Sequence, residues 1–162
     1  MKNIISLFLA ISLFTSCVEK KWEKSDNGVI IRLKGKTGED AKLIKIKPVS
    51  DRIIHVIASP QGSFSGNRSL CVYDQPGPGT LYDVSESGDS LIIATPEIKA
   101  SASLITGAVT FRDKSDKILL RESEKGGKSF YPVSVEGTDG YSLHQVFDSL
   151  ADEAFYGLGQ HQ

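Results

Sequence analysis

Short apolar runs, separated by turn residues, recur along most of the chain and restrict its fold more than any other feature. In residues 42–49, Ile44, Ile46 and Pro48 fall on one face of an extended chain, while the residues between them fall on the other. This period of two is typical of a half-buried β-strand. No segment carries the sustained apolar stripe of an amphipathic helix. We therefore expect an all-β protein.

The same pattern predicts about ten short strands, which favours an antiparallel β-sandwich. Fifteen glycines and six prolines, clustered in short groups, supply the turns between the strands. A loop-rich stretch covers residues 59–79 and is interrupted by one short run. The predicted strands comprise residues 29–33, 42–49, 53–58, 70–73, 91–95, 98–104, 108–112, 118–121, 133–136 and 143–147.

The first seventeen residues have the pattern of a targeting signal. Lys2 precedes an apolar stretch over residues 4–14, which is shorter than a bilayer span and is followed by small residues before Cys17. This arrangement resembles a bacterial lipoprotein signal, although Phe14 stands where the pattern usually has leucine. The resemblance implies that cleavage exposes Cys17, which is acylated and becomes the new N-terminus. The alternative is an ordinary secretory signal, with Cys17 incidental.

We consequently expect a membrane anchor at Cys17 and a location in the bacterial cell envelope, in the periplasm or at the outer membrane. Residues 18–27, which are polar and charged, are predicted to form a tether before the folded domain. Trp22, the single tryptophan, is expected to pack on the domain's first strand rather than to stack on a sugar.

Composition excludes several function classes. Nineteen basic and twenty acidic residues give a net charge of -1, which provides no basic surface for nucleic acid. Two cysteines and three scattered histidines predict neither a disulfide scaffold nor a metal site, and we expect no cofactor. The sequence contains no phosphate-binding glycine loop, zinc-protease helix or nucleophile elbow. The acidic residues lie mostly in turns, where such residues usually form Asx turns, and the sequence alone pairs no two of them as catalytic carboxyl groups.

Two separate motifs stand out in the second half of the chain. The first runs from residue 98 to residue 122 as three strands joined by a Thr-Gly turn and a Lys/Ser/Asp turn, and the second, EAFYGLGQ, covers residues 153–160. Together they resemble the N-terminal β-sandwich domain of glycoside hydrolase family 31, the α-glucosidase and α-xylosidase family. Residues 51–56 are similar to a further family strand, with His55 where arginine is commoner. The matching residues of the two motifs are Thr106, Gly107, Val109, Phe111, Asp113, Leu119 and Glu122, then Glu153, Tyr156, Gly157, Leu158, Gly159 and Gln160.

The resemblance implies a galactose-mutarotase-like sandwich over residues 28–162. Family members are retaining enzymes whose two carboxyl groups project from a (β/α)8 barrel that follows this sandwich. Such a barrel needs about 250 residues, so we expect a partial gene product or an excerpt that is not catalytic by itself. Its role would be to support the barrel and line the cleft that binds an α-linked oligosaccharide. Residues 156–160 would form the domain junction.

Two other functions remain open from the sequence. A stand-alone carbohydrate-binding sandwich would need an exposed aromatic platform, for which Tyr73, Tyr82 and Tyr131 are the candidates. A structural lipoprotein without a ligand would have no large apolar surface patch. A domain made to pack on a barrel should instead expose the apolar face that meets it.

Overall fold

The computed structural model describes residues 20–35, 37–66, 80–149 and 153, and these residues contain strands and no helix. The expected lipidation residue Cys17, the expected strand at residues 70–73 and the motif at residues 156–160 all lie outside the described residues. No helix in the described ranges is long and apolar enough to cross a membrane.

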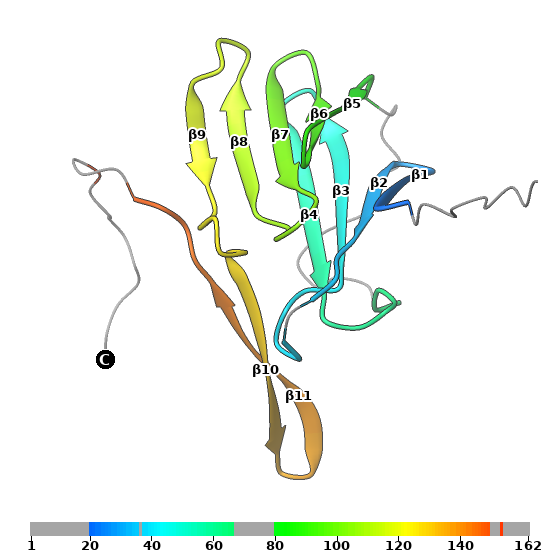
Figure 1. Cartoon of the computed structure of the whole chain (residues 1–162), viewed down its shortest axis with the longest axis vertical. Helices are drawn as coiled ribbons and strands as arrows, with labels where there is room; N and C mark the ends of the chain where they lie inside the picture. Colours follow the sequence, from blue (N-terminus) through cyan, green and yellow to red (C-terminus); the bar gives the residue numbers. More distant parts are fainter. Residues whose placement is uncertain (1–19, 36, 67–79, 150–152, 154–162) are drawn as a thin grey trace, which may run out of the picture.

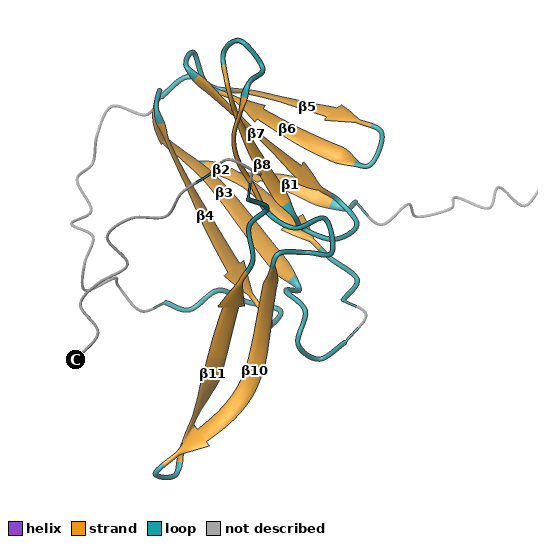
Figure 2. Ribbon diagram, turned by 90° about the vertical axis from the view of Figure 1, so that its left-hand side faces the viewer, coloured by secondary structure: helices purple, strands orange, loops and turns teal. Residues whose placement is uncertain are grey.

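Two antiparallel sheets pack face to face and make the body of the protein (Figures 1 and 2). In each sheet, every strand pairs with its neighbour in sequence, so both sheets are meanders. The four-stranded sheet comprises β1 (Trp22–Ser25), β2 (Gly28–Arg32), β3 (Leu43–Ser50) and β4 (Ile53–Ser59). The five-stranded sheet comprises β5 (Asp83–Ser87), β6 (Ser90–Ala94), β7 (Ile98–Ser103), β8 (Val109–Asp113) and β9 (Ile118–Arg121).

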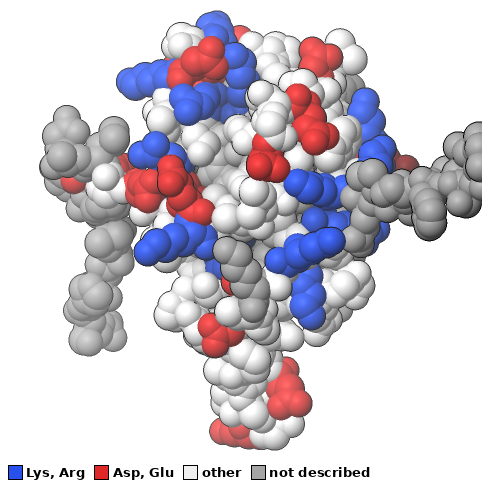
Figure 3. Space-filling view, viewed as in Figure 1, with Lys and Arg blue, Asp and Glu red and all other residues white. Residues whose placement is uncertain are grey.

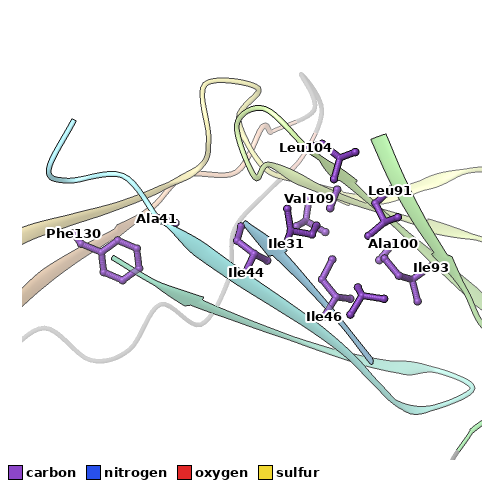
Figure 4. Close-up of a cluster of buried hydrophobic side chains, with 12 residues drawn as sticks. Ile31, Ala41, Ile44, Ile46, Leu91, Ile93, Ala100, Leu104, Val109 and Phe130 are labelled. Atoms are coloured by element: carbon purple, nitrogen blue, oxygen red, sulfur yellow. The ribbon is translucent and has the colours of Figure 1, made fainter. Parts of the chain in front are cut away.

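The core lies between the two sheets and follows the alternation in the sequence (Figure 4). On β3, Ile44 and Ile46 are fully buried, while the lysines between and after them are partly exposed. On β7, Ala100 and Ala102 face the same core, and Leu104 continues that face after the strand ends. The predicted all-β class and the predicted facing of Ile44 and Ile46 are thus confirmed.

A long hairpin, β10 (Lys128–Val135) and β11 (Thr138–Gln145), projects from one end of the sandwich as a separate two-stranded sheet (Figures 1 and 2). The sequence predicted only short strands at 133–136 and 143–147, which was wrong in extent. Glu136 belongs to the turn instead of the strand, with φ of 50°, and Gly137 follows with φ of 80°. Positive φ at both central residues is the geometry of a two-residue turn that matches strand twist.

Strand β1 lies inside the segment that was predicted to be a tether. Trp22 pairs with Ile31 of β2, packs against the core, and donates a hydrogen bond from Nε1 to Glu86 Oε2 at 2.7 Å. The packing expected for Trp22 is therefore observed. Part of the polar segment before residue 28 therefore belongs to the folded domain.

Candidate functional site: the base of the β10–β11 hairpin

Residues 106–109 and Glu122, the two ends of the first motif, lie at the end of the sandwich from which the hairpin leaves, whereas the β8–β9 turn lies at the other end. Val109, Phe111 and Asp113 lie on β8, Leu119 lies on β9, and Glu122 directly follows β9. Three of these positions have a distinct physical role: Gly107 in a turn between strands, Asp113 in the next turn, and Glu122 beneath the hairpin.

Gly107 lies where the β7–β8 turn touches the opposite sheet. Its φ is 75°, and an added Cβ would lie 2.5 Å from Leu33 Cδ1 and 2.6 Å from Ile44 Cδ1. Both the backbone conformation and the lack of space thus require glycine. The neighbouring Thr106 Oγ1 accepts a hydrogen bond from the Ala108 N–H at 3.3 Å. The Thr-Gly pair therefore lets the turn close directly over the core.

Asp113 organises the turn between β8 and β9. Its Oδ1 accepts hydrogen bonds from the Ser115 N–H at 2.8 Å, from the Ser115 hydroxyl at 2.6 Å and from the Lys117 N–H at 3.0 Å. The Ser115 hydroxyl is the main cause of a lowered pKa at Asp113. Desolvation opposes the shift, while the Lys117 and Ser115 amides and the charge of Lys117 add to it. Asp113 is thus a turn-forming carboxylate, as expected from its Asp-Lys-Ser sequence context.

Glu122 forms the centre of a polar cluster at the base of the hairpin. Its side chain is 4% exposed, and its carboxylate accepts hydrogen bonds from the Val109 N–H at 2.9 Å and from Gln145 Nε2 at 2.9 Å. Lys128 Nζ completes the cluster through an ion pair with Glu122 and a hydrogen bond to the Gly107 carbonyl at 3.3 Å. The cluster therefore ties β8, the end of β9 and both strands of the hairpin together.

Burial governs the chemistry of Lys128. Only 8% of its side chain is exposed, and this desolvation lowers its pKa, while the hydrogen bond and charge of Glu122 oppose the shift. Gly127 precedes it with φ of 66°, and a Cβ there would lie 2.7 Å from Glu122 Cβ. The absence of a side chain at residue 127 thus makes room for the buried pair.

Backbone hydrogen bonds fix the base of the hairpin on both sides. The Phe130 N–H of β10 donates to the Glu39 carbonyl at 2.8 Å, on the side of the first sheet. On the other side, the Val146 N–H donates to the Gly127 carbonyl at 2.7 Å, and the Ser123 N–H donates to the Val146 carbonyl at 3.1 Å. The direction in which the hairpin projects is therefore set by the sandwich.

The cluster is suited to holding structure and not to glycoside hydrolysis. Hydrolysis needs two carboxyl groups about 5–9.5 Å apart around the sugar, whereas Glu122 is the one acidic side chain that is buried among the described residues. Its oxygens are already bound to a lysine, an amide side chain and a backbone N–H. Nor does any group of three or more His, Cys, Asp or Glu in the described ranges come close enough to hold a metal ion.

The remaining candidate residues lie apart from one another. Tyr82 is partly buried against the core, whereas Tyr131 lies on the hairpin with its ring 4.8 Å from that of His144; Tyr73 lies outside the described residues. Tyr82 and Tyr131 thus do not form one platform. His55 is exposed on β4, opposite Lys47. The sequence indicated Glu122 through its motif, but Lys128 and Gln145, which are its partners, carried no signal of their own.

Comparison with known proteins gives consistent results. Residues 43–162 match the family model described as the glycosyl hydrolase 31 N-terminal galactose mutarotase-like domain. The chain is similar to the crystal structure of a GH31 α-xylosidase from Xanthomonas citri, with 37% sequence identity and a TM-score of 0.75, over 86% of this chain and 15% of that one. It also shares its fold with a GH31 α-xylosidase from a soil metagenome, solved with xylose, at 22% identity and a TM-score of 0.64, over 88% and 22% of the two chains.

Proposed function

Because the chain belongs to glycosyl hydrolase family 31, whose N-terminal galactose mutarotase-like domain it carries, we propose that it serves as the non-catalytic domain of an α-glycosidase that acts on α-xylosides. The preference for xylosides rests on the 37% identity to the Xanthomonas citri α-xylosidase. The chain spans only 15% and 22% of the two solved relatives, so their activity belongs to polypeptides that are several times longer.

The observation that carries this proposal is the apolar surface of the hairpin. Its large exposed side chains include valines, a leucine and two tyrosines, all on a two-stranded element that projects into solvent. A structural lipoprotein without a partner would not be expected to expose such a patch. The hairpin instead fits a domain that packs on another part of a larger enzyme.

A chimaeric enzyme tests the proposal. This chain would replace the corresponding N-terminal segment of the Xanthomonas citri α-xylosidase, and hydrolysis of p-nitrophenyl α-xyloside would be measured. We expect the chimaera to hydrolyse the substrate, while the same enzyme without any N-terminal segment, and this chain alone, do not. Turnover by the chain alone, or an inactive and misfolded chimaera, would contradict the proposed role. Calorimetric titration of the chain with xyloglucan oligosaccharides would detect a stand-alone carbohydrate-binding function.

We also propose that the protein is held in the cell envelope through lipid attached to Cys17, as its resemblance to a lipoprotein signal implies. Several acyl chains, each CH2 contributing about 0.8 kcal/mol, would hold the chain firmly on a membrane. When the full chain is produced in a bacterium fed an alkyne analogue of palmitate, we expect the label on the protein and its recovery with membranes. The Cys17→Ser variant should carry no label. Equal labelling of both proteins would show that Cys17 is not acylated.

A further inference from the structure

The hairpin presents apolar side chains on both of its faces. Cross-strand partners share a face, so the register places Pro132 and Tyr141 on one side and Val133 on the other. The first face also carries Phe130 and Leu143. The second also carries Tyr131 and Val135, which come from β10, while β11 contributes Thr138, Ser142 and His144 to that face. Leu143 is 66% exposed on one face and Val135 is 65% exposed on the other. A strand with one solvent face would alternate apolar with polar residues, as β11 does, whereas β10 carries four consecutive apolar residues from Phe130 to Val133.

Only the base of the hairpin is covered by the sandwich. In β10, Phe130 is buried, but every residue from 131 to 135 is exposed, and β11 is exposed throughout. The uncovered part of β10 is about 17 Å long at 3.4 Å per residue. A two-stranded hairpin that stands alone in water is marginally stable at best. Its conformation is consequently suited to an environment in which both faces are covered.

Charge indicates what the covering surface is like. All nineteen Lys and Arg residues precede residue 129, whereas the hairpin beyond Lys128 carries Glu136 and Asp139 near its turn. Figure 3 shows this projecting part in white and red. Exposed strands that must avoid partners usually carry lysine. This hairpin instead combines exposed apolar side chains on both faces with an acidic tip, which favours a slot that has apolar walls and basic residues at its inner end.

We propose that the β10–β11 hairpin inserts between two surfaces of the catalytic part of the enzyme, with one apolar face against each surface. This inference rests on the proposed function, because the partner that would cover both faces is the remaining polypeptide of a family 31 glycosidase. The Xanthomonas citri relative contains such a polypeptide, since only 15% of its chain corresponds to this one. The anchored base described above would fix the angle of insertion.

Two substitutions of equal exposure, one on each face, test the insertion in the chimaera. We expect Leu143→Asp and Val135→Asp each to lower kcat/KM on p-nitrophenyl α-xyloside by at least about tenfold and to lower the midpoint of thermal unfolding, because each buries an unpaired carboxylate. In this chain alone, both variants should unfold at the temperature of the unsubstituted chain, since both side chains already face water. Ile53→Asp is the matched control: Ile53 is 56% exposed and opens β4 at the opposite end of the sandwich. Its chimaera should stay within about twofold of the parent.

The possible results separate the alternatives. Loss of activity from only one face would mean that the hairpin lies flat on a single surface, and loss from neither would mean that it does not dock; both results would overturn the insertion. Sedimentation of the full chain as a dimer that Leu143→Asp dissociates, with the chimaera unaffected, would assign the faces to a second copy instead. An inactive unsubstituted chimaera would overturn the proposed function, and this inference with it.

Discussion

Glu122 and Lys128 have opposite charges in a place where neither meets water. Removing one partner of such a pair leaves the other charge buried, which is far more costly than removing both. The Val109 N–H and Gln145 also depend on the Glu122 carboxylate. At this scale the motif's final glutamate is an acceptor that holds three separate parts of the chain.

We expect Glu122→Leu to reduce the free energy of unfolding by about 3–5 kcal/mol, because Lys128 is left unpaired. The double variant Glu122→Leu with Lys128→Met should lose only about 1–2 kcal/mol, mainly from the unsatisfied Val109 N–H. Urea denaturation of the full chain, followed by circular dichroism, measures these values and that of Lys128→Met alone. A double variant as unstable as the sum of the single variants would mean that the two side chains do not interact.

Asp113 should make stability depend on pH in the acid range. Its pKa is lowered from 3.8 in the folded chain, so its contribution is fully present above pH 3.8 and is lost as the pH falls through the lowered value. Asp113→Asn keeps an acceptor but does not titrate. The difference in unfolding free energy between the two proteins should therefore shrink as the pH falls from about 3.8 through the lowered pKa. A difference that grows on acidification would show that Asp113 is not stabilised as the anion.

A single side chain, Trp22, holds strand β1 against the core. Trp22→Ala should lower the free energy of unfolding by about 2 kcal/mol, since it removes a partly buried indole and its hydrogen bond to Glu86. Trp22→Phe keeps the packing and should lose less than about 1 kcal/mol. Thermal unfolding followed by far-ultraviolet circular dichroism gives the comparison. If residues 22–25 were only a tether, neither substitution would change stability.

The pattern of short apolar runs between turn residues was sufficient to predict most elements of the two sheets. It identified β2, β3, β4, β6, β7, β8 and β9 to within a residue or two, and all of these except β9 place side chains in the core. It failed for β1 and for β5, whose sequences WEKS and DVSES carry one apolar anchor each. Such edge strands are specified by pairing with a neighbour, and pairing leaves no periodic signal in the strand itself.

The candidate site was predictable only in part. The Thr-Gly turn and Glu122 stood out through the family resemblance, but the partners of Glu122 lie 6 and 23 residues further along the chain. The hairpin was missed for a different reason. Residues 130–133 are four consecutive apolar residues, so apolar side chains lie on both faces of β10. The sequence therefore shows no period of two that would tell which face meets water. Such a pattern is typical of strands covered on both sides.

At the scale of the whole molecule, the sandwich and the hairpin have different roles. The sandwich buries an apolar core between its two sheets. The hairpin adds little to that core beyond Phe130, yet the polar cluster fixes its base. An arrangement that rigidly presents an unburied element fits a role within a larger assembly.

The meander order of both sheets has a consequence for how the chain folds. Every strand bonds to a neighbour in sequence, so each pairing closes a short loop, and only the two faces must find each other over a longer distance. Loop closure entropy sets much of the folding rate, and all-β sandwiches are slow when their pairings are remote. We therefore expect this domain to fold faster than sandwiches with crossed connections, with the first sheet able to form on the ribosome before the second has been synthesised.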